Sequence, residues 1–262
     1  MITEKAFRVT VRTTEPLRIG AKKDPLSGAD NPVTHVGGNI AIPGSSLKGA
    51  LRNQIESYLI DKFYQGGKWQ AGKEDWKPCV PGAELSADER RLIRDGKYRD
   101  QDGTCHYPCS DRTCRGQIHS ICPVCYLLGA MTLPGFVRVP FLFAEGGAGE
   151  LVGVRLDRAT KTIPQVGRGG PVRSYELVPQ GTAFTGTLYV ALADTITGWE
   201  LGKSRKLGEE RNTKGDKWLE GQTYTQDAFL REFILDRLAS LKTIGGYKSK
   251  GFGRIETAAV TA

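Results

Sequence analysis

Six cysteines occur in this 262-residue chain, and the spacing of four of them indicates metal chemistry. Cys122 and Cys125 form a Cys-x-x-Cys pair, and Cys109 and Cys114 form a wider pair just before it. Such clustering in a chain without a secretion signal is typical of metal binding rather than of disulfides. Four thiolates make a closed tetrahedral Zn²⁺ site, which is structural because no position is open to a substrate. One ligand place stays open to three alternatives: Cys105, His106 and His119.

A second group of residues could hold phosphate. Ser45 and Ser46 follow Pro43-Gly44 and open an expected helix that carries Lys48 and Arg52. Serine at a helix start caps free backbone N–H groups, and such groups also bind anions. Because residues four apart share a helical face, the two cations lie together beside this helix start. The segment therefore predicts a site for a phosphate backbone.

A third group lies in the long loop from Gly20 to Gly38. Asp24 and Asp30 could bind a divalent cation or act in acid–base chemistry; the alternative is that both are ordinary turn residues. Pro32 restricts the backbone just after Asp30, so we expect this aspartate to be held in place. His35 could be a proton-transfer partner or a structural residue.

A fourth group is the glycine-rich loop near the C-terminus, from Gly245 to Gly253. Glycines allow a ligand to approach the backbone closely, and the neighbouring cations would attract phosphate. Tyr247 and Phe252 could stack on bases, or they could belong to the core. The cations of this loop are Lys248, Lys250 and Arg254.

Hydrophobic periodicity predicts the elements that must position these groups. Strict alternation predicts a strand from Ala6 to Thr14, and apolar stripes predict helices over 46–64 and 227–241. Further strands are expected at 135–144, 151–156, 186–194 and after the glycine-rich loop. This order indicates an α+β, ferredoxin-like βαββαβ core in one domain spanning 1–262. Three segments lie outside that core: an insertion over about 65–130 with no core of its own, a basic hairpin over about 157–174, and a mobile loop over 201–218.

The chain carries a net charge of +8 and has a pI of about 9.2, which favours an acidic partner, most often nucleic acid. The alternative is a basic surface that only keeps the protein in solution. The polar face of the first strand, with Arg8 and Arg12, is open to the same two interpretations. The N-terminus has no signal-peptide pattern and no apolar run is long enough to span a membrane, so we expect a cytoplasmic protein without a membrane partner.

Four motifs in this order resemble the RAMP superfamily of CRISPR effector proteins: IPGSSLKGALR, CPVCYLLGA, LDRATKT followed by YELVPQGTAF, and GGYKSKGFGRI. They cover the chain from Leu17 to Ile255. The resemblance is to the repeated backbone subunit of type III complexes, of the Csm and Cmr kind. In two respects the chain departs from that pattern. Thr34-His35 stands where members often carry an arginine–aspartate pair, and the cysteine-rich insertion is longer than usual.

The resemblance implies a modified RNA-recognition-motif palm with an inserted thumb hairpin and a zinc-knuckle insertion. Copies of the chain would stack as a filament along a CRISPR guide RNA, together with other effector subunits. The thumb would flip nucleotides out of the guide–target duplex, and Asp30 would cut the target RNA beside each of them with Mg²⁺ or Mn²⁺. The protein would thus be an endoribonuclease only in the assembled complex. The implied RNA-binding residues are Ser45, Ser46, Lys48, Arg52, Arg158, Lys161, Arg168, Lys248, Lys250 and Arg254.

Two alternatives remain on the same fold. The first is a guide-RNA-binding filament subunit that does not cut. The second is a ribonuclease that processes the guide precursor. Such relatives usually act through histidine or other acid–base pairs, and here only His35 lies near the loop.

Overall fold

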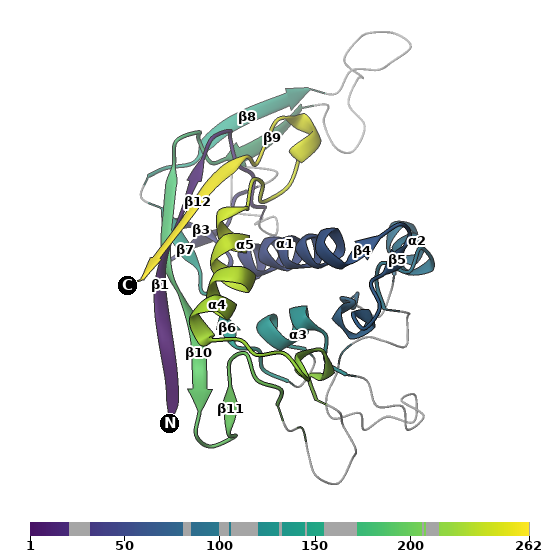
Figure 1. Ribbon diagram of the computed structural model, residues 1–262. Coiled ribbons are helices and arrows are strands. Elements are labelled where there is room, and N and C mark those ends of the chain that lie inside the picture. Colours follow the sequence, from purple (N-terminus) through teal and green to yellow (C-terminus); the bar gives the residue numbers. More distant parts are fainter. Residues whose placement is uncertain are drawn as a thin grey trace, which may run out of the picture.

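The computed structural model describes most of the chain (Figure 1). The described residues are 1–20, 32–80, 85–99, 105, 120–130, 133–144, 146–154, 172–205, 207 and 215–261.

An antiparallel sheet forms the centre of the molecule, with the strand order β12-β1-β10-β7-β3-β2. Short strands β6 and β11 also pair with β10. Helix α1 lies between β1 and β7 in the chain, and the helical segment α4–α5 lies between β10 and β12. The mixed α+β class is therefore confirmed, and the order is consistent with the expected ferredoxin-like βαββαβ core, with β2 and β3 added between β1 and α1. The strands are β1 (Ile2–Thr13), β2 (His35–Val36), β3 (Asn39–Ile42), β6 (Val137–Arg138), β7 (Leu142–Ala144), β10 (Ala183–Asp194), β11 (Trp199–Glu200) and β12 (Ile255–Thr261).

The helices cover one face of this sheet, and no described helix lies on the other face (Figure 1). On β1, Phe7, Val9 and Val11 are buried toward the helices, whereas Arg8 and Arg12 are exposed on the opposite face. This is the alternation that a half-buried strand requires, because successive side chains point to opposite faces.

Helix α1 (Gly44–Phe63) is anchored by an aliphatic stripe, Leu47, Leu51, Ile55 and Leu59, each with no exposed surface. Full burial of each of these side chains stabilises the fold by about 2 kcal/mol. The helix begins one residue before Ser45. Its N-cap is Pro43, and no side chain caps it, so the prediction that a serine caps this helix is wrong. Gly44 is required at its start, because a Cβ there would collide with the Val139 carbonyl oxygen.

The second helical segment consists of α4 (Gln226–Leu230), a π-helical turn η5 (Arg231–Leu235) and α5 (Asp236–Ala239). The Thr225 side chain caps its start by accepting a hydrogen bond from the Ala228 amide. The buried side chains are those of the predicted stripe, namely Phe229, Leu230, Phe233, Ile234, Leu238 and Leu241. Apolar periodicity did not predict the π turn.

The segment after α1 is not the coreless insertion that the sequence indicates. Trp76 is 2% exposed and packs against Phe63 at 4.8 Å and Trp218 at 4.9 Å between ring centroids, so the segment shares the main core. Its aromatic residues are widely spaced along the chain, which is why no period shows in the sequence. The elements here are β4 (Tyr64–Gln65), β5 (Lys68–Trp69), η1 (Glu74–Trp76), α2 (Ala87–Arg94) and α3 (Pro123–Leu128).

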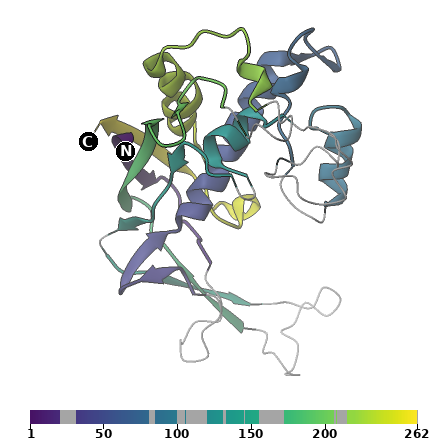
Figure 2. The same ribbon diagram turned by 90° about the horizontal axis from the view of Figure 1, so that it is seen from below.

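Strands β8 (Gly149–Val154) and β9 (Val172–Leu177) pair as a separate antiparallel ribbon that projects from the main sheet in both views (Figure 1, Figure 2). The basic residues expected between them, Arg158, Lys161 and Arg168, lie outside the described residues.

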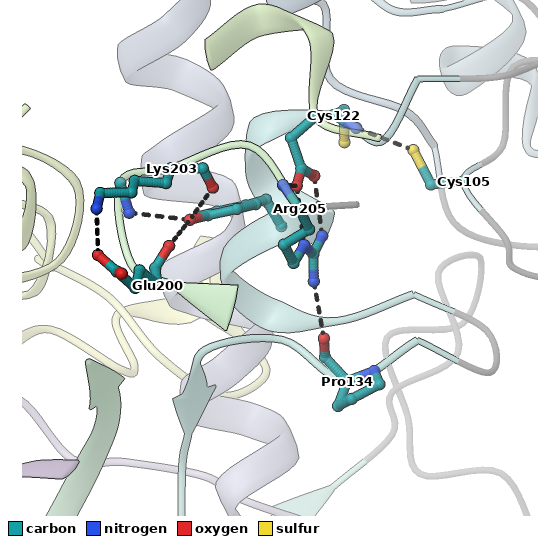
Figure 3. Close-up of polar contacts among 9 residues, drawn as sticks. Cys105, Cys122, Pro134, Glu200, Lys203 and Arg205 are labelled. Carbon is teal, nitrogen blue, oxygen red and sulfur yellow. Dashed lines mark hydrogen bonds and ion pairs between the residues drawn. The ribbon is translucent and has the colours of Figure 1, made fainter. Parts of the chain in front are cut away.

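The ends of the segment 201–218 are fixed, contrary to the mobile loop predicted for it. Arg205 and Asp216 form an ion pair at 2.8 Å, and neither side chain has any exposed surface. Arg205 also donates to the Pro134 carbonyl oxygen at 3.1 Å (Figure 3). Its guanidinium lies over the ring of Tyr126. The charged residues of this segment predicted a solvent-exposed loop. The prediction failed because the buried ion pair joins residues eleven positions apart, a pairing that the sequence does not show. Two short 3-10 turns, η4 (Lys217–Leu219) and η6 (Lys248–Lys250), complete the described elements.

Candidate functional site

A groove of about 1100 Å³ opens at the start of α1. Gly44, Ser45 and Lys48 form one wall, and residues 133–139 around β6 form the other. No side chain caps the start of α1, and the Ser46 and Leu47 amides donate to the Pro43 carbonyl oxygen, which leaves the Gly44 and Ser45 amides at the helix start. Backbone donors and a lysine therefore face one hollow, which suits a phosphate group.

Arg138 on β6 adds a second cation to this groove. Its side chain is 65% exposed, lies 3.4 Å from the carboxylate of Glu4, and stacks over the ring of Tyr189 at 4.5 Å. An exposed ion pair of this kind contributes little stability, so the guanidinium can exchange Glu4 for a phosphate at small cost. Arg138 was not predicted from the sequence. The sequence signal that could have found this residue is its outward-facing position in the alternating strand expected at 135–144.

Arg52 does not face solvent beside Lys48 as predicted. Its side chain is only 14% exposed and lies 2.7 Å from the Glu56 carboxylate, in an ion pair that lacks hydrogen-bond alignment. It donates to the Cys79 carbonyl oxygen at 2.8 Å and approaches the sulfurs of Cys79 and Cys125 at 3.6 and 3.8 Å. Lys48 is exposed as expected. The Arg52 side chain is instead largely buried, where it contacts thiols and a carboxylate.

Four buried thiols form a compact cluster: Cys79, Cys105, Cys122 and Cys125. Their sulfur atoms all lie within 4.8 Å of one another, and the closest two, in Cys79 and Cys125, are 3.4 Å apart. Zn–S bonds of about 2.3 Å place tetrahedral sulfurs about 3.8 Å apart, so the cluster fits a metal such as zinc.

The ligand set differs in part from the one that spacing suggested. Cys122 and Cys125 are in the cluster as predicted, and Cys105, one of the alternatives, is there too. Cys79 was missed because it lies 43 residues before Cys122. Cys109 and Cys114 lie outside the described residues.

Two backbone amides donate hydrogen bonds to sulfurs of the cluster. The Cys122 amide donates to the Cys105 sulfur at 3.2 Å (Figure 3), and the Cys125 amide donates to the Cys122 sulfur at 3.4 Å. Cys122 is the N-cap of α3, which directs these amides inward. Such donors stabilise thiolates rather than thiols.

Two arginines supply positive charge to the cluster. Burial alone would lower the pKa of Arg52 and of Arg99, but the negative charge of the cysteines, together with Glu56 beside Arg52 and Asp75 beside Arg99, raises the pKa of both above the usual value. Arg99 lies 3.9 Å from the Cys105 sulfur and is held by the carbonyl oxygens of Asp75 and Lys77. A zinc ion with four thiolates carries a net charge of −2, which these two cations would balance. The sequence offered no signal for Arg99.

The loop that carries Asp24 and Asp30 lies outside the described residues, but its base is described. Gly20 pairs with Val33 in an antiparallel bridge, and the Thr34 amide donates to the Ile19 carbonyl oxygen at 2.9 Å. The Val33 amide donates to the carboxylate of Glu176 on β9, also at 2.9 Å. The loop is therefore closed at its base and tied to the β8–β9 ribbon.

His35 follows this base on β2 and is exposed. Its Nδ1 lies 3.2 Å from the Val33 carbonyl oxygen.

The glycine-rich loop keeps its cations on the surface, as predicted. Lys248, Lys250 and Arg254 are exposed, and Lys250 lies over the ring of Tyr247. Tyr247 adopts the left-handed conformation at φ 59°, which is strained for a non-glycine residue. Arg18 lies over the same ring at 4.8 Å, so Tyr247 is occupied by cations within the chain.

No helix among the described residues is long and apolar enough to cross a membrane.

A comparison with curated proteins finds no match. A solved structure described as a Type IV-B CRISPR Complex is similar at a TM-score of 0.46 and 14% identity, over 97% of this chain and 90% of that chain. A TM-score below 0.5 does not support an argument about the fold or function of this chain. The RAMP superfamily model matches residues 10–256, nearly the whole length, and the chain therefore belongs to the RAMP superfamily.

Proposed function

We propose that this chain is a guide-RNA-binding backbone subunit of a type III CRISPR effector complex that cuts complementary target RNA. The observation that carries the RNA-binding part is the groove at the start of α1, which is lined by Gly44 and Ser45 at the helix start and by the cations Lys48 and Arg138, in a RAMP superfamily fold. Base pairing between guide and target would supply sequence specificity, so the protein needs to hold only the backbone.

The groove would bind the guide by charge and by directed N–H groups. One phosphate at the helix start would accept hydrogen bonds from the first amides of α1, and Lys48 would neutralise its charge. Arg138 would hold a neighbouring phosphate after leaving Glu4. The cations of the glycine-rich loop form a second basic surface that would contact the RNA backbone elsewhere.

Cleavage would depend on Asp30. A carboxylate there would accept a proton from a ribose 2′-OH or position Mg²⁺ beside the scissile phosphate. The closed loop base at Gly20 and Val33 supports this role, because it fixes where the loop begins and ends. Its tie to β9 through Glu176 would connect the loop to the ribbon expected to carry the thumb.

The thiol cluster would bind structural Zn²⁺ through Cys79, Cys105, Cys122 and Cys125. All four sulfurs would be used, so the ion would leave no open position for chemistry. Its role would be to fix residues 79–125 against α1.

The test uses the effector complex assembled with its guide RNA and incubated with a complementary labelled RNA, with and without Mg²⁺. Asp30→Ala is compared with Asp24→Ala, a matched change in the same loop. We expect Mg²⁺-dependent cuts at regular spacing that Asp30→Ala abolishes and Asp24→Ala keeps, with guide retention unchanged in both.

Uncut target with wild-type complex would instead identify a non-catalytic filament subunit. Cutting of guide precursor by the isolated chain without Mg²⁺ would identify a processing ribonuclease.

A further inference from the structure

The face of the sheet opposite the helices carries an aromatic pair that the groove does not use. Phe141 and Phe143 are 42% and 40% exposed, and their rings lie 6.2 Å apart at an interplanar angle of 27°. Between them in the chain, Leu142 has no exposed surface and points to the helices. The core position of this strand is therefore filled by Leu142, and core packing does not account for the two phenylalanines.

Strand register places basic and hydroxyl side chains beside this pair. Phe143 is opposite Thr185 on β10, and Thr185 is opposite Thr10 on β1, so these three lie in one row across the sheet. Arg8 and Arg12 flank Thr10 on the same face and are both exposed. Two strand spacings of about 4.8 Å separate the aromatic pair from this row of cations, about 10 Å in all.

A third cation lies at the other end of the face. Arg138 pairs in register with Tyr189 and stacks on its ring. Two acidic residues lie beside these arginines in the described part of the chain: Glu4 contacts Arg138, and Glu256 is opposite Arg12 in register. Arg8 has no acidic partner in register, since its neighbours are Thr187 and Val260.

We propose that this open face is a second nucleic-acid surface, on which single-stranded RNA stacks its bases on Phe141 and Phe143 and places its phosphates near Arg8 and Arg12. Near-parallel exposed rings beside arginines and threonines combine the two features that bind single strands: a stacking platform and a positive track. A duplex would not fit, because its bases are already stacked on each other. Phe141, Phe143, Arg8 and Arg12 do not line the groove at α1, whereas Arg138 and Glu4 border both surfaces.

A second copy of this chain is the rival occupant. Obligate protein interfaces have an apolar centre from which charges are depleted. Here the centre of the face carries Thr10, Thr185 and Thr187, with Arg8 beside them. The charge and hydroxyl content therefore favour RNA.

The test measures binding of a labelled oligouridylate to the purified, nucleic-acid-free full chain by fluorescence anisotropy. Stacking on one aromatic ring multiplies single-strand affinity by about 5- to 100-fold. We expect Phe141→Leu/Phe143→Leu to weaken binding at least about tenfold and Phe141→Tyr/Phe143→Tyr to keep it. The leucine variant retains apolar surface, so its loss would report stacking.

Two controls locate the effect. Ile196→Ala removes an 85% exposed apolar side chain from a turn away from the face and should change nothing. Arg8→Ala should lower the salt dependence of binding by about 0.7 in the log–log slope, the value for one phosphate of a single strand. Lys48→Ala should weaken binding by a factor that multiplies with that of the leucine variant, because the two surfaces are separate.

Equal affinity of the leucine variant and wild type would overturn the proposal. So would preferred binding of a duplex of the same length. If sedimentation shows that wild type self-associates and Phe141→Ala/Phe143→Ala abolishes this without changing RNA affinity, the face is an interface between copies. The two proposals can fail separately. If Lys48→Ala leaves RNA affinity unchanged but Phe141→Leu/Phe143→Leu lowers it, the proposed groove is wrong and the open face still binds RNA.

Discussion

Replacement of Cys79 by serine tests the metal site most directly. Cys79 belongs to the cluster of four thiols in the structure but not to the ligand set that the cysteine spacing predicted. The Cys79 sulfur lies 3.4 Å from that of Cys125 and 3.7 Å from that of Cys122, and its side chain is 1% exposed. Serine keeps the size of the side chain but removes one of four thiolates.

The expected loss follows from the number of ligands. A structural zinc site contributes about 10–16 kcal/mol, so one of four ligands is worth roughly 3 kcal/mol, or about two orders of magnitude in zinc affinity. Cys79 also links the segment before α2 to α3, so the free energy of unfolding should fall with the affinity.

The assay is metal content by mass spectrometry together with zinc release to a competing chelator of known affinity. Cys109→Ser is the matched control, since it removes a cysteine of the pair that spacing favoured. We expect wild type and Cys109→Ser to hold one zinc per chain and Cys79→Ser to release it about a hundredfold more readily. Full zinc in Cys79→Ser, with loss in Cys109→Ser, would refute the cluster as the binding site.

Three further predictions concern stability. Asp216→Ala leaves Arg205 buried without its partner and should lower the free energy of unfolding by about 3–5 kcal/mol in urea titrations. Burial raises the pKa of Glu56 to about 7, against the opposing effect of the arginine beside it. Since the folded state then holds its proton to higher pH than the unfolded state, wild-type stability should fall between pH 4.5 and 7 by about 3 kcal/mol, and Glu56→Gln should remove this slope in unfolding curves taken across that range. Gly186→Ala puts a Cβ 2.5 Å from a β7 side chain and should cost about 1–3 kcal/mol, whereas Gly49→Ala, in open space on α1, should stabilise the protein by up to about 1 kcal/mol in the same titration.

The sheet and its two long helices were predictable because their signals are local. The alternation of β1 and the apolar stripe of α1 are each formed by residues close together in the chain. The apolar residues of both patterns are the ones that are buried. The family motifs are also continuous in sequence. Where a feature depends on residues that are near in the chain, periodicity and spacing were enough to find it.

Features that depend on distant residues could not be predicted in the same way. Cys79 reaches its partners across 46 residues, and Arg205 and Asp216 meet across a segment that looked solvated. Helical position alone placed Arg52 beside Lys48, but it could not show that two thiols and a carboxylate lie on the Arg52 side. Long-range contacts of this kind are set by the packing of whole elements and leave no period in the sequence.

Arg52 connects the two sites that the sequence treated separately. It lines the groove at α1 and also contacts the sulfurs of Cys79 and Cys125, so one side chain belongs to the wall of both. A metal ion in the cluster would fix the thiolates and, through them, the guanidinium that closes the inner end of the groove. Without the thiolates, Arg52 would keep only Glu56 and a carbonyl oxygen as partners and would be drawn toward any phosphate in the groove. The thiol cluster is thus placed to influence the shape and charge of the groove at α1 as well as to stabilise the segment that follows α1.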